Sequence, residues 1–148
     1  MNVYTYPFGE KLVPVVQQDR TSKKVFVLGV YASAVHAKWL NRDGRTLVQA
    51  LAVASEPYIF WRGDGAETII NRINVPREMG SLIPASMNFN GPSGKTLDSL
   101  FLGPLGFRRE DAWLCDLVPH TCLNASQRTA IEREYNPRIL KYDLPEVT

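Results

Sequence analysis

Two continuous apolar runs constrain the fold of this chain more than any other feature of its sequence. One is VFVLGVY, residues 25–31, and the other is DAWLCDLVP, residues 111–119, which ends at a proline. Short apolar runs of this kind are typical of strands that are buried on both faces, as they are in a parallel sheet. We therefore expect the two runs to form neighbouring strands at the centre of a mainly parallel sheet.

The segments between these runs indicate helices that alternate with strands. Ser33 is a candidate N-cap, and AVHAKWL after it predicts a helix that continues to Asn41 and the Asp43-Gly44 turn. We expect a further strand at 46–54, a loop-rich excursion over 75–92, and helices at 65–73, 93–103 and 126–135. This order predicts the α/β class, with a three-layer α/β/α sandwich around the sheet. In such sheets ligands bind beyond the carboxyl ends of the strands.

Length and composition indicate one ordinary globular domain. The chain has 148 residues, of which 45% are hydrophobic and 22% charged. We expect an N-terminal arm over 1–24 and a single domain over 25–148. No apolar run is long enough to span a membrane and no signal peptide begins the chain, so we expect a cytoplasmic protein without a membrane partner. The net charge of +2 permits contact with nucleic acid without requiring it.

The two cysteines do not indicate a cofactor. Cys115 and Cys122 have neither the number nor the spacing of an iron–sulfur or zinc site. A metal site drawn from them and His120 lacks a fourth ligand. We expect both thiols to be reduced and structural, and we expect no cofactor.

The stretch FNGPSGKTLDSL, residues 89–100, is similar to the end of a phosphate-binding loop. That motif needs a glycine where the chain has Phe89, and it needs a buried strand before it, which the preceding LIPASMN does not provide. The other interpretation is a turn at Gly91-Pro92 that leads into a helix capped by Ser93. In that case the glycines allow another part of the backbone to approach closely.

Three loops together give the chain a family resemblance. VLGVYAS (27–33), NFNGPSGKTLD (88–98) and LGFRREDAWLCDLVP (105–119) follow the order of the motifs in the uracil-DNA glycosylase superfamily. The chain most resembles the thermophile-type iron–sulfur branch, without the cysteines of its cluster, and the resemblance covers most of residues 25–126. It implies the glycosylase fold, DNA or a nucleobase as the partner, and hydrolysis of the N-glycosidic bond of a damaged base in DNA repair.

The resemblance assigns a base pocket to these loops. Phe89 matches the aromatic residue on which a flipped base stacks, although a core phenylalanine is the alternative. Asp116 stands where the superfamily usually has an asparagine that reads uracil. An amide both donates and accepts, whereas an ionised carboxylate only accepts. Asp116 could therefore read an edge with two donors, could be protonated in an apolar pocket, or could only bond loop amides.

The first motif departs from the pattern of active members, which have Asp, Asn or Glu where this chain has Val30 and Tyr31. We assign these two residues to the base-binding wall with Phe89 and Asp116. The loop backbone of the pocket is assigned to Gly29, Ser33, Asn90, Gly91 and Gly94.

Other polar residues have weaker assignments. His120 and His36 are candidate catalytic groups, and the alternatives are a solvent-facing loop histidine and a packed or capping histidine. Lys95, Arg108 and Arg109 are candidate phosphate contacts, with a solvated surface as the alternative.

Two functions on this fold stay open, an excising DNA glycosylase and an inactive module that binds a nucleobase or nucleic acid. A small-molecule enzyme on a generic α/β scaffold is a third possibility. The superfamily ends with a strand and an H-x-S loop, and ILKYDLPEV (139–147) matches only part of that strand. We expect the domain to lack this last strand and loop, and we predict no appreciable excision of uracil because neither the acid nor the histidine is in its usual place.

Overall fold

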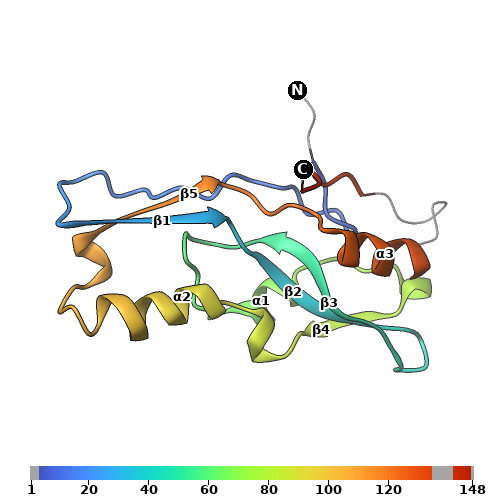
Figure 1. Cartoon of the computed structure of the whole chain (residues 1–148). Coiled ribbons are helices and arrows are strands. Elements are labelled where there is room, and N and C mark those ends of the chain that lie inside the picture. The colour runs from blue at the N-terminus through green and yellow to red at the C-terminus, as the bar shows by residue number, and fades with distance from the viewer. Residues whose placement is uncertain (1–3, 135–141, 148) are drawn as a thin grey trace.

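The two apolar runs at 25–31 and 111–119 form a two-stranded parallel sheet. The computed structural model describes residues 4–134 and 142–147. Strand β1 (Val25–Tyr31) pairs in parallel with β5 (Ala112–Val118), and Gly29 lies opposite Asp116 (Figure 1). The prediction that these strands are neighbours is confirmed.

A three-stranded antiparallel sheet follows directly. Strand β2 (Ala34–Leu40) lies between β3 (Thr46–Ser55) and β4 (Ser81–Pro84), and only residues 32–33 separate it from β1. The fold is therefore mixed α/β, with a parallel and an antiparallel sheet.

The predicted helix after Ser33 is wrong, because the segment is β2. Its buried residues Val35, Ala37 and Trp39 alternate with less buried ones, which is the period of a strand. The Asp43-Gly44 dipeptide belongs to the hairpin turn between β2 and β3, where Asn41 Oδ1 accepts hydrogen bonds from two backbone N–H groups. Ser33 therefore caps no helix.

The other predicted helices are present, with shifted ends. The helices are α1 (Ala66–Asn71), α2 (Pro92–Thr96), the π-helical η3 (Leu97–Leu102) that continues it, and α3 (Ala125–Glu134). Short 3₁₀ turns are η1 (Arg77–Met79), η2 (Met87–Phe89) and η4 (Arg109–Asp111). The predicted loop at 75–92 contains β4, which the sequence analysis missed.

One face of β1 is half-buried within the described residues. Val25 and Val27 pack with Leu97 and Leu102, so α2 and η3 cover that face (Figure 1). On the opposite face the side chains of Phe26, Leu28 and Val30 are 61%, 51% and 58% exposed. The expectation that this strand is buried on both faces is therefore wrong.

The N-terminal arm takes part in the core rather than merely leading to it. Tyr6 and Phe8 are buried, and the ring of Phe8 meets Trp39 edge-on at 5.5 Å between centroids. Gln17 lies along the outer edge of β5, where its side chain bonds the carbonyl of Ala112 and the N–H of Leu114.

The C-terminal segment is only partly described. Of the expected strand ILKYDLPEV, residues 139–141 lie outside the described residues. The described part forms isolated bridges, antiparallel between Thr5 and Asp143 and parallel between Leu123 and Glu146. Within residues 4–134 and 142–147, no helix is long and apolar enough to cross a membrane.

Candidate functional site

A small cavity lies where β1 and β5 end. Its volume is about 90 Å³. The lining residues come from β1, the β1–β2 junction, the segment after β3, α2 and β5, and they are Gly29, Val30, Tyr31, Ser33, Glu56, Phe60, Ser93 and Asp116. The carboxyl ends of parallel strands are where α/β proteins usually bind ligands, so this cavity is the candidate site.

The lack of a side chain at Gly29 leaves room for the Asp116 carboxyl group in the cavity. A Cβ atom on residue 29 would lie 2.1 Å from Asp116 Oδ1 and 3.1 Å from Phe60 Cζ. Any side chain at this position would therefore displace the carboxyl group or the ring. Burial raises the pKa of Asp116 above its ordinary value.

A second carboxyl group, that of Glu56, lines the same cavity. Glu56 directly follows β3 and is 4% exposed. Burial, followed by the negative charge of Asp116, raises its pKa to about 7, although backbone N–H groups of Trp61 and Ser33 bond the carboxylate and Arg109 attracts it. At neutral pH a substantial fraction of Glu56 is therefore protonated.

Phe60 forms an aromatic wall in an unusual backbone conformation. Its φ of 51° makes it the one non-glycine residue with positive φ in the described part of the chain. This conformation is costly for a bulky side chain and is found disproportionately at functional sites.

Arg109 holds Phe60 in place from η4. Its Nη2 donates to the carbonyl of Phe60 at 2.6 Å and to that of Gly94 at 3.2 Å, and Nη1 donates to that of Ile59 at 3.2 Å. Its Nε donates to Asp98 at 2.9 Å. All three guanidinium nitrogens are thus engaged inside the protein, which argues against Arg109 as a phosphate contact.

The glycine-rich loop packs tightly against the segment that contains Phe60. A Cβ atom on Gly94 would lie 2.2 Å from the carbonyl oxygens of Phe60 and Trp61, and one on Gly91 would lie 2.1 Å from the carbonyl carbon of Arg62. The glycines therefore serve close approach of two backbone segments, and the loop brings Ser93 to the cavity.

The structure brings together most of the residues assigned to base binding, but not all of them. Val30, Tyr31 and Asp116 line the cavity together with Gly29 and Ser33. Phe89 lies on η2, is 45% exposed and is not among the lining residues. Phe60 occupies the aromatic wall that the sequence analysis assigned to Phe89.

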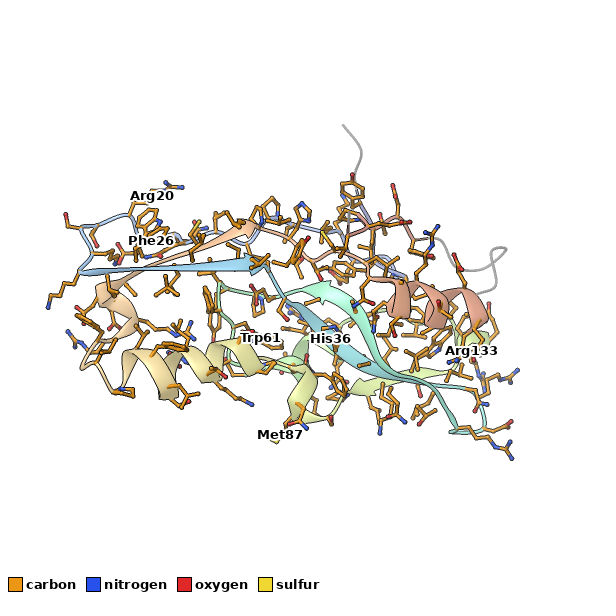
Figure 2. All side chains as sticks on the ribbon, viewed as in Figure 1. Arg20, Phe26, His36, Trp61, Met87 and Arg133 are labelled. Carbon is orange, nitrogen blue, oxygen red and sulfur yellow. The ribbon has the colours of Figure 1, made fainter. Side chains whose placement is uncertain are left out.

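Neither histidine lines the cavity. His36 lies on β2, near the middle of the molecule in Figure 2, and burial lowers its pKa, so it is neutral at neutral pH. Its Nδ1 is buried with no hydrogen-bond partner among the described residues. His120 follows β5, where its Nδ1 lies 3.2 Å from the carbonyl oxygen of Thr121 and 3.9 Å from Cys122 Sγ.

The remaining cations and thiols lie outside the cavity lining. Lys95 is exposed on α2, and Arg108 is exposed with an ion pair of 3.7 Å to Glu110. Cys115 and Cys122 are free thiols. Among residues 4–134 and 142–147, no three His, Cys, Asp or Glu side chains are grouped so that they could hold a metal ion.

Sequence reasoning missed Glu56 and Phe60, which both lie in the segment SEPYIFW (55–61). That segment was interpreted only as the end of a strand. An acidic residue two positions after the apolar run LAVA (51–54) was the available signal, since a strand end is where a buried carboxyl group can reach a ligand.

No protein-family model, curated protein or solved structure matches the chain.

Proposed function

We propose that the cavity binds a nucleobase, and that the chain is a uracil-DNA glycosylase-like protein whose partner is DNA or a nucleotide. The observation that carries this proposal is the convergence of Tyr31, Phe60 and Asp116 on one cavity at the ends of β1 and β5. Aromatic side chains offer a stacking surface to any base, and a carboxyl group offers hydrogen bonds to its edge. The three-layer glycosylase-like sandwich is part of the same proposal.

The size of the cavity fits part of a nucleotide. A volume of about 90 Å³ is roughly that of three water molecules, whereas pockets that enclose whole ligands measure about 300–1,000 Å³. The edge of a base would enter the cavity while the rest of the nucleotide stays outside. This arrangement suits a base that has been turned out of a nucleic-acid strand.

Two activities are compatible with such binding, N-glycosidic hydrolysis and binding without chemistry. In hydrolysis the C1′–N bond breaks and its electron pair leaves with the base, water forms the new C1′–O bond, and one proton leaves the water while another reaches the base. Glu56 and Asp116 favour hydrolysis because they can carry these protons. The absence of a carboxyl or amide side chain at Val30 and Tyr31 favours the binding module.

Binding of single-stranded oligonucleotides that contain one deoxyuridine tests the proposal. We expect Phe60→Ala to weaken binding by about 1–3 kcal/mol, the usual contribution of one stacking contact, and Phe89→Ala to weaken it less. Equal losses would return the stacking role to Phe89. No binding of any oligonucleotide by the unmodified protein would refute the proposal.

Single-turnover release of uracil, hypoxanthine and xanthine from single- and double-stranded oligonucleotides separates the two activities. The prediction of no appreciable uracil release still stands, since the sequence offers no match to the histidine loop that stabilises the departing base. Release of any of these bases that disappears in Glu56→Gln would identify a glycosylase. Binding without any release would identify the binding module.

A further inference from the structure

We propose that Glu56 and Asp116 act as a pair in which Glu56 is protonated and Asp116 is ionised, and that this pair recognises a base edge with a carbonyl group beside a ring N–H. The inference rests on the proposed function, because it names the class of base that the cavity takes. Uracil, thymine, guanine, hypoxanthine and xanthine have such an edge, whereas cytosine and adenine present an amino group beside an unprotonated ring nitrogen.

The geometry places both carboxyl groups at one small cavity. Glu56 reaches it from the segment after β3 and Asp116 from β5, in the space that Gly29 leaves open. Glu56 is 4% exposed, so water cannot easily solvate a charge on it.

The surrounding charges determine how many protons the pair holds. Two ionised carboxylates at one site repel each other, so one of them binds a proton more tightly. Arg109 is the cation that acts on Glu56, but its N–H groups are already bonded to carbonyl oxygens and Asp98. The backbone N–H groups of Ser33 and Trp61 also favour the ionised form of Glu56.

These opposing influences leave Glu56 as the residue that holds the proton. Its pKa of about 7 is set first by burial and then by the charge of Asp116, and burial also raises the pKa of Asp116. Tyr31, the remaining titratable residue in the lining, supplies a hydroxyl group at the same cavity. Near neutral pH the pair therefore presents one acid O–H and one carboxylate.

An acid and a carboxylate together offer what a single amide offers. The O–H of Glu56 donates to a base carbonyl, and the carboxylate of Asp116 accepts from the neighbouring ring N–H. An asparagine side chain makes the same two hydrogen bonds with its Nδ2 and Oδ1. The pair differs from an amide in one respect, because it loses its donor when Glu56 ionises.

The test compares three single-stranded oligonucleotides that contain one deoxyuridine, one deoxycytidine or one N3-methyldeoxyuridine in a sequence whose other bases are all adenine. Affinity is measured by fluorescence anisotropy between pH 6 and pH 9. We expect the unmodified protein to prefer deoxyuridine at pH 6–7 and to lose affinity for it by about tenfold per pH unit above pH 8, as the donor is lost. Methylation of N3 removes the hydrogen bond to Asp116 and should abolish the preference.

Two variants assign the pH dependence to Glu56. Glu56→Gln keeps a donor at every pH, so its preference for deoxyuridine should persist to pH 9. Glu67→Gln, at an exposed residue on α1, is the matched control and should behave as the unmodified protein. An unchanged pH dependence in Glu56→Gln, or no preference for deoxyuridine over deoxycytidine, would overturn the inference.

A measurement without ligand tests the pair independently. Carboxyl ¹³C NMR of the full chain should show Glu56 titrating near pH 7, and Asp116→Asn should lower that midpoint because it removes the neighbouring charge. Titration of Glu56 at its ordinary value would refute the pair even if oligonucleotides bind. Absence of binding to all oligonucleotides, with Glu56 titrating near pH 7, would instead refute the proposed function and the assignment of the ligand.

Discussion

The side-chain amide of Asn90 makes two hydrogen bonds with the backbone of His36. Its Oδ1 accepts from the His36 N–H at 2.8 Å, and its Nδ2 donates to the His36 carbonyl at 2.9 Å. Asn90 is 4% exposed, so these bonds lie away from water and join the glycine-rich loop to β2. Asn90, which was assigned to the loop backbone of the pocket, is not among the residues that line the cavity, and its side chain instead holds the glycine-rich loop against β2.

Replacing Asn90 by alanine should destabilise the fold. The change leaves the N–H of His36 without this partner and removes one of two bonds to its carbonyl, which also accepts from Ala85. We expect a loss of about 2–4 kcal/mol in the free energy of unfolding, measured by urea denaturation. Asn88→Ala, at an exposed residue of the same turn, is the control and should change stability by less than about 0.5 kcal/mol.

Gly94→Ala should separate the two backbone segments that form the cavity wall. The new Cβ atom would meet the carbonyl oxygens of Phe60 and Trp61 at 2.2 Å, and neither is a flexible side-chain end that could move away. We expect a loss of more than about 2 kcal/mol in thermal or urea unfolding, together with weaker oligonucleotide binding. Thr96→Ala, exposed on the same helix, should leave both nearly unchanged, and equal behaviour of the two variants would contradict the close approach.

Glu56→Gln should change how stability depends on pH. The pKa of about 7 in the folded protein lies above the ordinary 4.5, so the folded protein binds this proton more tightly than the unfolded chain. That contribution is fully present below pH 4.5 and is lost as the pH rises through 7. Relative to the unmodified protein, the variant should gain on the order of 3 kcal/mol between pH 4 and pH 8.

Unfolding in urea at a series of pH values measures this effect, and the difference between the two proteins isolates Glu56 from other titrating groups. Glu67→Gln should show no such gain. A difference that does not vary with pH would mean that Glu56 titrates in the folded protein at the same pKa as in the unfolded chain.

Arg109 and Arg108 are neighbours in sequence, but their substitution should reduce stability by very different amounts. Arg109→Met removes the donors to the carbonyls of Ile59, Phe60 and Gly94, and we expect a loss of about 2–4 kcal/mol in stability. Arg108→Ala should cost less than about 0.5 kcal/mol, because its side chain is 80% exposed and its ion pair is long.

The salt dependence of oligonucleotide binding tests the other role of Arg108. If Arg108 contacts a phosphate, Arg108→Ala should weaken binding to all sequences alike and reduce the slope of log affinity against log salt by about 1. Lys95→Ala should act in the same way. Unchanged slopes in both variants would leave these side chains as solvated surface.

The sequence predicted the elements that have a clear apolar run or clear signals at their ends. The neighbouring strands β1 and β5 and the helices near 66, 92 and 125 follow from apolar runs, caps and proline or glycine ends. It failed at β2, because Val35 and Ala37 in AVHAKWL suit a strand as well as a helix and the hairpin partner β3 decides between them. It also failed at the outer face of β1, since an apolar residue does not specify what covers it.

The site was predicted as far as local chemistry allows. Val30, Tyr31 and Asp116 lie near the carboxyl ends of β1 and β5, and all three line one cavity. Glu56 and Phe60 come from a segment far away in sequence. The pairing of β2 with β3, in which Ala34 lies opposite Ser55, and the contacts of Arg109 and the glycine-rich loop bring that segment to the strand ends. No local sequence pattern could have predicted that this segment lies beside the ends of β1 and β5.

The short junction between β1 and β2 links the two sheets mechanically. Only residues 32–33 separate the strand that ends at the cavity from the central strand of the antiparallel sheet, and Ala32 is itself fastened to β5 by a bond from its N–H to the carbonyl of Val118 at 3.0 Å. We therefore expect a displacement of the end of β1 to be passed on to β2. Occupancy of the cavity should accordingly slow amide hydrogen exchange throughout β2 and β3, far beyond the atoms that a ligand touches.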